Sequence, residues 1–107
     1  MHFNTVYTFK TRRFTLELAV TPETDRPRDH FDDDATCYAI DQGVYEWFVA
    51  RVRVLLDGRE VSTEYMGGCC YEAVAQFRKD IYFHDMARDA IRAARQTLTN
   101  PPRLRDM

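Results

Sequence analysis

The sequence predicts a small α+β domain in which a three-stranded, mostly antiparallel sheet packs on a C-terminal helix. Residues 44–65 alternate apolar and polar side chains on both sides of Asp57-Gly58. This pair favours a hairpin with a type I′ turn, because both central residues of such a turn take positive φ. Residues 5–20 alternate in the same way and supply the third strand. Residues 81–98 carry an apolar residue every three or four positions, which indicates an amphipathic helix.

We expect residues 5–20 to form one long, bent strand. The apolar residues of its second half share one side, whereas Tyr7 and Phe9 in the first half have the opposite parity. A strand that keeps both sets on the core side needs a bulge near residues 11–13. The alternative is a tight turn at that point, which would split the segment into two strands. We favour the single bent strand.

The two strands of the hairpin are expected at residues 44–56 and 59–66. One face of this ribbon is then apolar, which suits a sheet covered on one side. The expected register pairs Leu56 with Arg59, Val54 with Val61, and Val52 with Thr63. Gly67-Gly68 follows the hairpin and lacks the sequence context of a phosphate loop. We expect this pair to form a hinge where the chain leaves the sheet.

Three helices are expected around the strands. A short helix near residues 35–42 ends at Gly43, because glycine readily takes the left-handed conformation that closes many helices. A second short helix is expected near residues 70–79, and the main helix over residues 81–98. Two prolines follow the main helix, so residues 99–107 are expected to form a loose tail. At 107 residues, the chain 1–107 is expected to be a single domain.

Residues 21–34 are expected to form an acidic loop. They contain two prolines, six acids and two arginines, and proline cannot donate to a regular strand ladder. Over residues 21–46 the count is eight acids and two arginines, whereas residues 51–107 hold ten basic residues and eight acids. We therefore expect an acidic region on the folded surface and a basic face on the main helix.

The composition argues against several broad classes of protein. A formal net charge of −2 disfavours direct nucleic-acid binding, which gains from a basic excess through counterion release. No apolar run reaches the length of about 18 residues that a membrane-spanning helix needs. The first residues lack the apolar core of a secretory signal, so a cytoplasmic protein is expected. The three cysteines are expected to be free thiols, because their number is odd.

Residues that commonly carry chemistry are few. His30 lies next to the acids of residues 32–34, but no spacing typical of a zinc or calcium site occurs. A solvated acidic loop is therefore favoured, and no metal or cofactor is expected. Cys69 or Cys70 can be considered as a nucleophile with His84 as its base, but no third group that would orient the imidazole is evident. We expect no catalytic residues and no enzymatic activity.

The acidic segment is the best candidate for a functional site. An exposed acidic strip can imitate a nucleic-acid backbone, and aromatic side chains beside it, such as Tyr45, Trp47 and Tyr38, can supply affinity once they are desolvated. The alternative is that the acids only keep the loop soluble. The residues expected to bind a partner protein are Glu23, Asp25, Asp29, Asp32, Asp33, Asp34, Tyr45 and Trp47.

Several stretches of the chain resemble short proteins that are carried by phages and other mobile elements of Gram-negative bacteria. These stretches are VYTFKTRRFTLEL near the start, LLDGREV followed by MGGCCYE in the middle, and YFHDMARDAIRAAR near the end. Proteins of this size, acidity and origin include the anti-CRISPR proteins. None of the stretches is a catalytic signature, so the resemblance carries no catalytic residue with it.

The resemblance implies a phage-encoded, non-enzymatic inhibitor that binds a bacterial CRISPR effector complex, with a multi-subunit (type I) complex favoured. Such a protein would occlude the DNA-binding surface or the nuclease-docking surface of the effector, in the cytoplasm of the host bacterium. The alternative is a regulatory or accessory protein of the mobile element, with a homodimer as an option. It would contact nucleic acid through a basic C-terminal segment that contains Arg88, Arg92, Arg95, Arg103 and Arg105.

Overall fold

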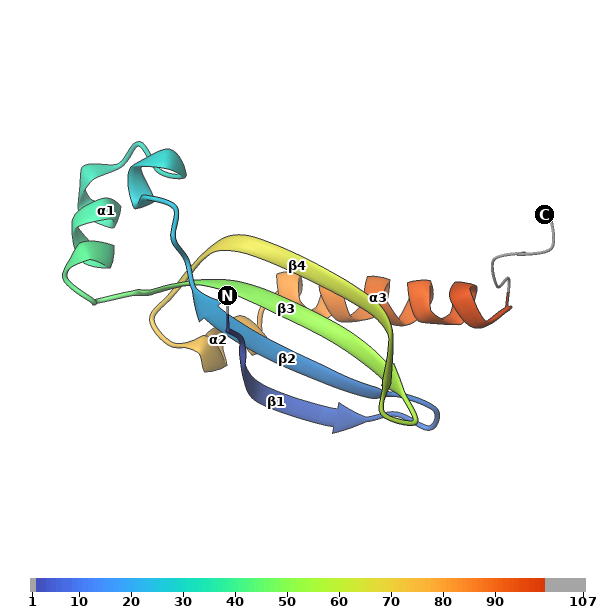
Figure 1. Cartoon of the computed structure of the whole chain (residues 1–107). Coiled ribbons are helices and arrows are strands. Elements are labelled where there is room, and N and C mark those ends of the chain that lie inside the picture. Colours follow the sequence, from blue (N-terminus) through green and yellow to red (C-terminus); the bar gives the residue numbers. More distant parts are fainter. Residues whose placement is uncertain (1, 100–107) are drawn as a thin grey trace.

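A computed structural model describes residues 2–99 of the chain. The fold is α+β, with one four-stranded antiparallel sheet whose strands lie in sequence order (Figure 1). The strands are β1 (Asn4–Lys10), β2 (Thr15–Pro22), β3 (Glu46–Leu56) and β4 (Arg59–Tyr71). The helices are the 3₁₀ helix η1 (Pro27–Asp29), α1 (Asp34–Asp41), α2 (Val74–Arg78) and α3 (Ile81–Thr99). No helix in this part of the chain is long and apolar enough to cross a membrane.

The prediction of one bent strand over residues 5–20 is wrong, because the segment is a hairpin of β1 and β2 and the sheet therefore has four strands. The turn is closed by Thr11, whose N–H donates to Phe14 O at 2.8 Å and whose Oγ1 accepts from Phe14 N at 3.0 Å. The chain reverses direction at this turn, which explains why the apolar residues before and after it have opposite parity in the sequence. Tyr7 lies opposite Leu18, so both side chains lie on the same side of the sheet.

The turn between β3 and β4 has the predicted form, since Asp57 and Gly58 both take positive φ, at 52° and 79°. The predicted register is wrong beyond the first pair. Leu56 does face Arg59, but Val54 faces Ser62 and Val52 faces Glu64. The register shifts by one residue between Val54 and Leu55, because Val61 is an extra residue in β4, and such a bulge does not show in an alternating pattern.

The predicted hinge at Gly67-Gly68 is also wrong, because β4 continues through both glycines to Tyr71. The register shift between Phe48 and Ala50 places the two glycines opposite the single residue Val49. This second bulge needs a residue at φ 65°, which Gly68 supplies. The longer strand leaves α2 starting at Val74 instead of near residue 70.

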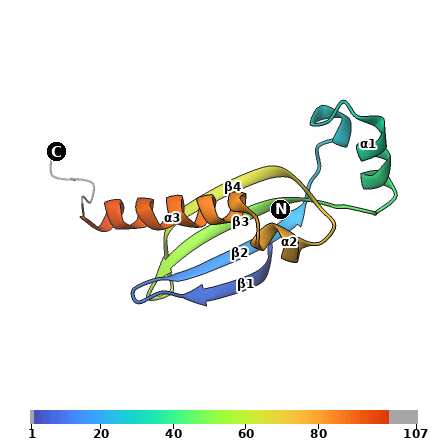
Figure 2. The same ribbon diagram turned by 180° about the vertical axis from the view of Figure 1, so that it is seen from behind.

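The main helix is confirmed as α3. It packs on one face of the sheet, against β3 and β4 (Figure 2). The short helix expected near residues 35–42 is confirmed as α1. Of the expected tail, Thr99 belongs to α3 and residues 100–107 lie outside the described part of the chain. The largest fully buried side chains of the core are Phe77, Leu16, Leu18, Val52 and Val54.

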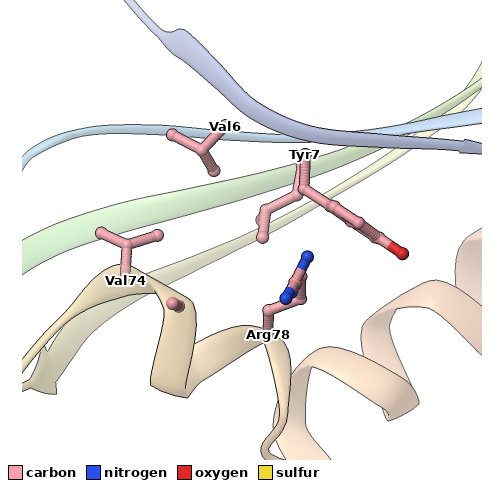
Figure 3. Close-up of a pocket in the computed structure, with 6 residues that line it drawn as sticks. Val6, Tyr7, Val74 and Arg78 are labelled. Carbon is pink, nitrogen blue, oxygen red and sulfur yellow. The ribbon is translucent and has the colours of Figure 1, made fainter.

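A single helix is too narrow to cover this sheet. Strands lie about 4.8 Å apart, and a helix with its side chains is about 10 Å wide, so α3 covers about two strands. The inner side of β1 is left to α2, which packs beneath it without filling the space. A cavity of about 260 Å³ remains between β1 and α2 (Figure 3).

Within residues 2–99, side chains and no helix cover the opposite face of the sheet. Arg53 lies there, with Nε 2.7 Å from Glu17 Oε1 on the neighbouring strand. Arg51 has its guanidinium carbon 4.7 Å from the centre of the Phe3 ring, which in turn lies 6.0 Å from the ring of Tyr65. Long polar side chains and two aromatic rings thus replace a second layer of helices.

Candidate functional site

The chain between β2 and β3 forms a lobe beyond one end of the sheet, with η1 and α1 close together (Figure 1). We call residues 23–45 the acidic lobe. Local signals shape it: Pro27 starts η1, and Asp33 caps α1 by accepting hydrogen bonds from the N–H groups of Ala35 and Thr36. Gly43, at φ 78°, ends α1. The predicted loop is therefore partly helical.

A small apolar cluster holds the acidic lobe together. Cys37 and Ile40 on α1 are buried, and the Cys37 thiol donates a hydrogen bond to Phe31 O at 3.6 Å. The ring of Phe31 packs against Trp47 of β3, with the ring centres 5.8 Å apart. The lobe has too little apolar surface for an independent core, so its shape depends on this contact with the sheet.

Trp47 was expected to anchor a partner, and the structure shows that it anchors the lobe. Its Nε1 donates to the backbone O of Asp25 at 2.9 Å. Its ring also meets the ring of His30 edge to face, at 5.1 Å between centres. Trp47 is half-buried by these contacts, and Tyr45 two residues earlier is half-buried as well.

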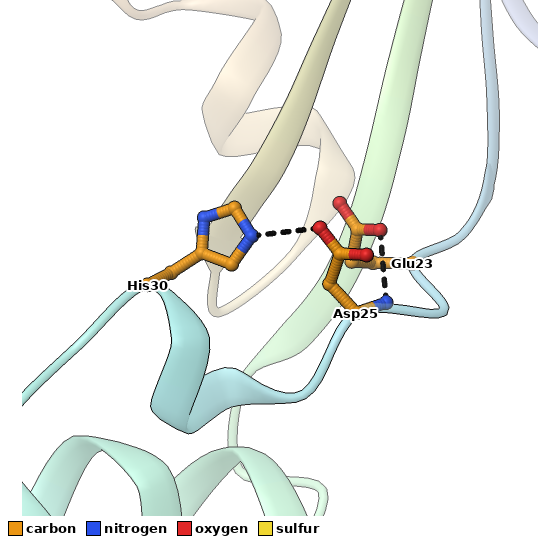
Figure 4. Close-up of side chains that lie close together, drawn as sticks. All are labelled: Glu23, Asp25 and His30. Carbon is orange, nitrogen blue, oxygen red and sulfur yellow. Dashed lines mark hydrogen bonds and ion pairs between the residues drawn. The ribbon is translucent and has the colours of Figure 1, made fainter.

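Glu23, Asp25 and His30 form a polar cluster where the acidic lobe meets β4 (Figure 4). Glu23 Oε1 accepts the N–H of Gly68 at 2.7 Å, and Glu23 Oε2 accepts the N–H of Asp25 at 3.1 Å. His30 Nε2 lies 3.1 Å from Asp25 Oδ2. Gly68 is required here, since a Cβ atom would lie 2.6 Å from His30 Nδ1.

One ligand atom from each of these three residues lies within 4.8 Å of the others, so this is the place where the described chain could hold a divalent cation. Among the described residues, His30 joins Glu23 and Asp25 in this cluster and not the acids of residues 32–34 that follow it in the sequence. The cluster already has a structural use, because both Glu23 oxygens accept backbone N–H groups. Sequence reasoning missed it: Glu23, Asp25 and His30 follow no metal-ligand spacing, and Gly68 lies 45 residues from Glu23.

The other predicted acids have different surroundings. Asp29 pairs with Arg26 at 3.1 Å, and the side-chain hydrogen bond from Arg26 lowers the pKa of Asp29. Asp34 pairs with Arg28 at 2.5 Å. Asp33 is held by its capping role, and its pKa is lowered first by the Thr36 hydroxyl.

Two exposed acids of the lobe, Asp32 and Asp41, have carboxylates with no ion pair or hydrogen bond to any described residue. Tyr38 and Val44 are 67% and 57% exposed on the same lobe. The lobe therefore exposes both carboxylates without an ion pair and large apolar side chains. Tyr38 stood among the aromatic candidates, whereas Val44 had no distinguishing signal in the sequence.

The basic face of α3 is largely neutralised by the acids of the same helix. Arg88 lies 3.5 Å from Asp85, and Arg92 lies 3.8 Å from Asp89. Such exposed pairs are weak in stability, but they cancel the positive field that nucleic-acid binding would use. Arg103 and Arg105 lie outside the described residues.

The cysteines are placed for packing. Burial raises the pKa of the Cys69 thiol to about 11, and its Sγ donates to Met66 O at 3.4 Å. Burial also raises the pKa of Cys70. A nucleophilic cysteine needs the opposite change, because the thiolate is the reactive form. No hydrogen bond joins either thiol to His84 within residues 2–99.

Comparison of the chain with family models, with curated proteins and with solved structures gives no match.

Proposed function

We propose that the protein is a non-enzymatic inhibitor that places its acidic lobe against a basic, DNA-binding surface of a partner protein. The observation that carries the proposal is the separation of charge along the chain. Residues 21–46 hold eight acids and two arginines, a formal charge of −6, and the other residues together carry +4. The acidic part is also the part that extends past the end of the sheet (Figure 1).

The lobe has both features of a protein-binding surface. The carboxylates of Asp32 and Asp41 supply attraction over distance and speed association with a basic partner. The exposed side chains of Tyr38 and Val44 supply apolar area that gains free energy when it is desolvated. The Trp47 contacts fix the lobe before it binds, which reduces the entropy that association costs.

The specific partner we propose is a subunit of a CRISPR effector complex, with type I complexes as the first candidates. The resemblance to phage proteins supports this partner, and a DNA-binding groove supplies the basic surface that the lobe needs. Inhibition then follows by occlusion, because the lobe and the target DNA occupy the same groove.

The test uses purified type I effector complexes and fluorescently labelled target DNA. We expect the protein to displace the DNA, with weaker displacement at higher salt. The D32K/D41K double variant should lose most of this activity and keep its melting temperature, because neither carboxylate has an ion-pair or hydrogen-bond partner among residues 2–99. These two positions are better than Asp33 and Asp34, whose replacement would also remove a helix cap and an ion pair.

The matched control is E60K/E72K, which changes the net charge equally at two exposed positions outside the lobe and leaves the ion pairs of α3 in place. It should displace DNA as the unchanged protein does. Equal losses in the two double variants would show that net charge matters and the lobe does not. Failure of the protein to bind any complex at moderate salt would refute the proposed partner.

A further inference from the structure

A groove runs along the inner side of β1, separate from the acidic lobe. Its first cavity, of about 260 Å³, has Val6, Tyr7 and Val74 among its lining residues (Figure 3). A second cavity, of about 440 Å³, continues past Phe9 and Phe83. Tyr7 and Arg78 line both cavities. We call the two together the β1 groove.

The groove follows from the topology. Since α3 packs toward β3 and β4, the described residues beneath the inner side of β1 come from α2 and the start of α3. The register shift between Thr5 and Tyr7 makes Val6 an extra residue in β1. Such a bulge turns a side chain away from regular alternation, and Val6 contributes to the first cavity while remaining 46% exposed.

The groove lies beside an open edge of the sheet. Within the described chain, β1 pairs with β2 on one side and with no strand on the other. The main-chain N–H and C=O groups along that edge can accept an added strand. A strand added there would direct alternate side chains toward the groove.

The groove carries positive charge with no anion to match it. The Arg78 guanidinium carbon lies 4.3 Å from the centre of the Tyr7 ring, between the two cavities. No carboxylate of residues 2–99 forms an ion pair with Arg78 or with Lys79 beside it. The half-buried Arg53 differs, because it is paired with both Glu17 and Glu60.

We propose that the β1 groove binds an extended segment of a partner protein, which adds to β1 as a fifth strand. The inward face of this segment has an apolar residue, an acidic residue and a second apolar residue at alternate positions. The apolar side chains enter the two cavities and the carboxylate pairs with Arg78. A second copy of this chain fits less well, since its β1 has no acid and would add Lys10 to a basic groove.

The test uses a labelled peptide, Thr-Leu-Thr-Glu-Thr-Leu-Thr, in which both Leu residues and the Glu share one face of a strand. We expect it to bind and to shift the amide NMR signals of β1, α2 and the first turn of α3. The control peptide, Thr-Leu-Glu-Thr-Thr-Leu-Thr, has the same composition but carries its Glu on the other face. It should bind about tenfold more weakly, the ratio that corresponds to about 1.4 kcal/mol.

The R78Q variant should bind both peptides with equal, reduced affinity, whereas R95Q on the exposed side of α3 should behave as the unchanged protein. Equal affinity of the two peptides for the unchanged protein would overturn the proposal, and so would NMR shifts confined to the acidic lobe. Dimerisation of the protein alone, with protection of the β1 amides, would make a second copy the occupant and would also overturn it. These results leave the lobe proposal unaffected, because D32K/D41K should bind the peptide normally.

Discussion

Glu23 Oε1 accepts the backbone N–H of Gly68 at 2.7 Å, and this bond joins the acidic lobe to the bulged part of β4. The imidazole of His30 lies over the same glycine, close enough that a Cβ atom would lie 2.6 Å from Nδ1. The position of the lobe therefore depends on a glycine in the sheet, although the two are far apart in the sequence.

We predict that Gly68→Ala destabilises the protein more than Gly43→Ala does. Both glycines have positive φ, at 65° and 78°, so each substitution costs about 1–2 kcal/mol of backbone strain. Only at position 68 does the new methyl group meet a neighbour, which adds about 1–3 kcal/mol. Urea unfolding measures both costs.

The ring of His30 is the source of the extra cost, so His30→Ala in the Gly68→Ala background should recover part of it. Equal destabilisation by Gly68→Ala and Gly43→Ala would show that the imidazole does not occupy the position described.

We predict that Trp47→Phe loosens the acidic lobe and leaves the sheet intact. The variant keeps an aromatic ring against Phe31 but removes the Nε1 hydrogen bond to Asp25 O, at a cost of about 1 kcal/mol. Hydrogen exchange should become faster in η1 and α1 and should stay unchanged in β2 and β3. Faster exchange throughout the sheet would mean that Trp47 supports the whole domain and not the lobe alone.

The elements that the sequence predicted well have local signals. Asp57-Gly58 defines its turn through its own conformational preferences, and α3 shows its apolar stripe in consecutive residues. The split of residues 5–20 was missed because Thr11 closes that turn with a side-chain hydrogen bond, without glycine or proline. The opposite parity of Tyr7 and Leu16 was the available signal, and it was assigned to a bulge.

The sequence was enough to predict that the candidate site is rich in acids, but not which contacts these acids make. Arg26 and Arg28 form ion pairs with Asp29 and Asp34. The sequence does not show which of several nearby carboxylates each arginine pairs with, so it does not show which acids remain without an ion pair. The contacts of Trp47 join residues 16 to 22 positions apart, and the contact of Glu23 with Gly68 requires that β4 continue through both glycines. The two bulges of β4 that shift its register leave no mark in the alternation of side chains.

We predict that the Tyr71–Asp80 hydrogen bond makes the free energy of unfolding depend on pH. The Tyr71 hydroxyl donates to Asp80 Oδ2 at 2.7 Å and is the main cause that lowers the pKa of Asp80 below its ordinary value of 3.8. A carboxyl group with a lowered pKa in the folded state adds stability above its unfolded pKa. This contribution is lost as the pH falls through the lower, folded value.

Tyr71→Phe should therefore be less stable than the unchanged protein at neutral pH, and the difference should shrink below pH 3.8. Urea midpoints over a series of pH values measure it. Tyr38→Phe is the control, since that residue is 67% exposed and its hydroxyl has no partner among the described residues. A gap between Tyr71→Phe and the unchanged protein that persists at low pH would indicate lost packing instead of a lost charged hydrogen bond.

We predict slow reaction of the folded protein with thiol reagents, with Cys70 reacting before Cys37 and Cys69. Cys70 is half-buried, whereas the other two are buried. Burial raises the pKa of Cys69 to about 11, so little thiolate forms near neutral pH and the reagent must also wait for local opening. Mass spectrometry of labelled peptides identifies the site at each time, and denaturant should make all three thiols react rapidly. Fast, selective labelling of Cys69 in the folded state would contradict the described burial and would make the Cys69–His84 enzyme hypothesis worth pursuing again.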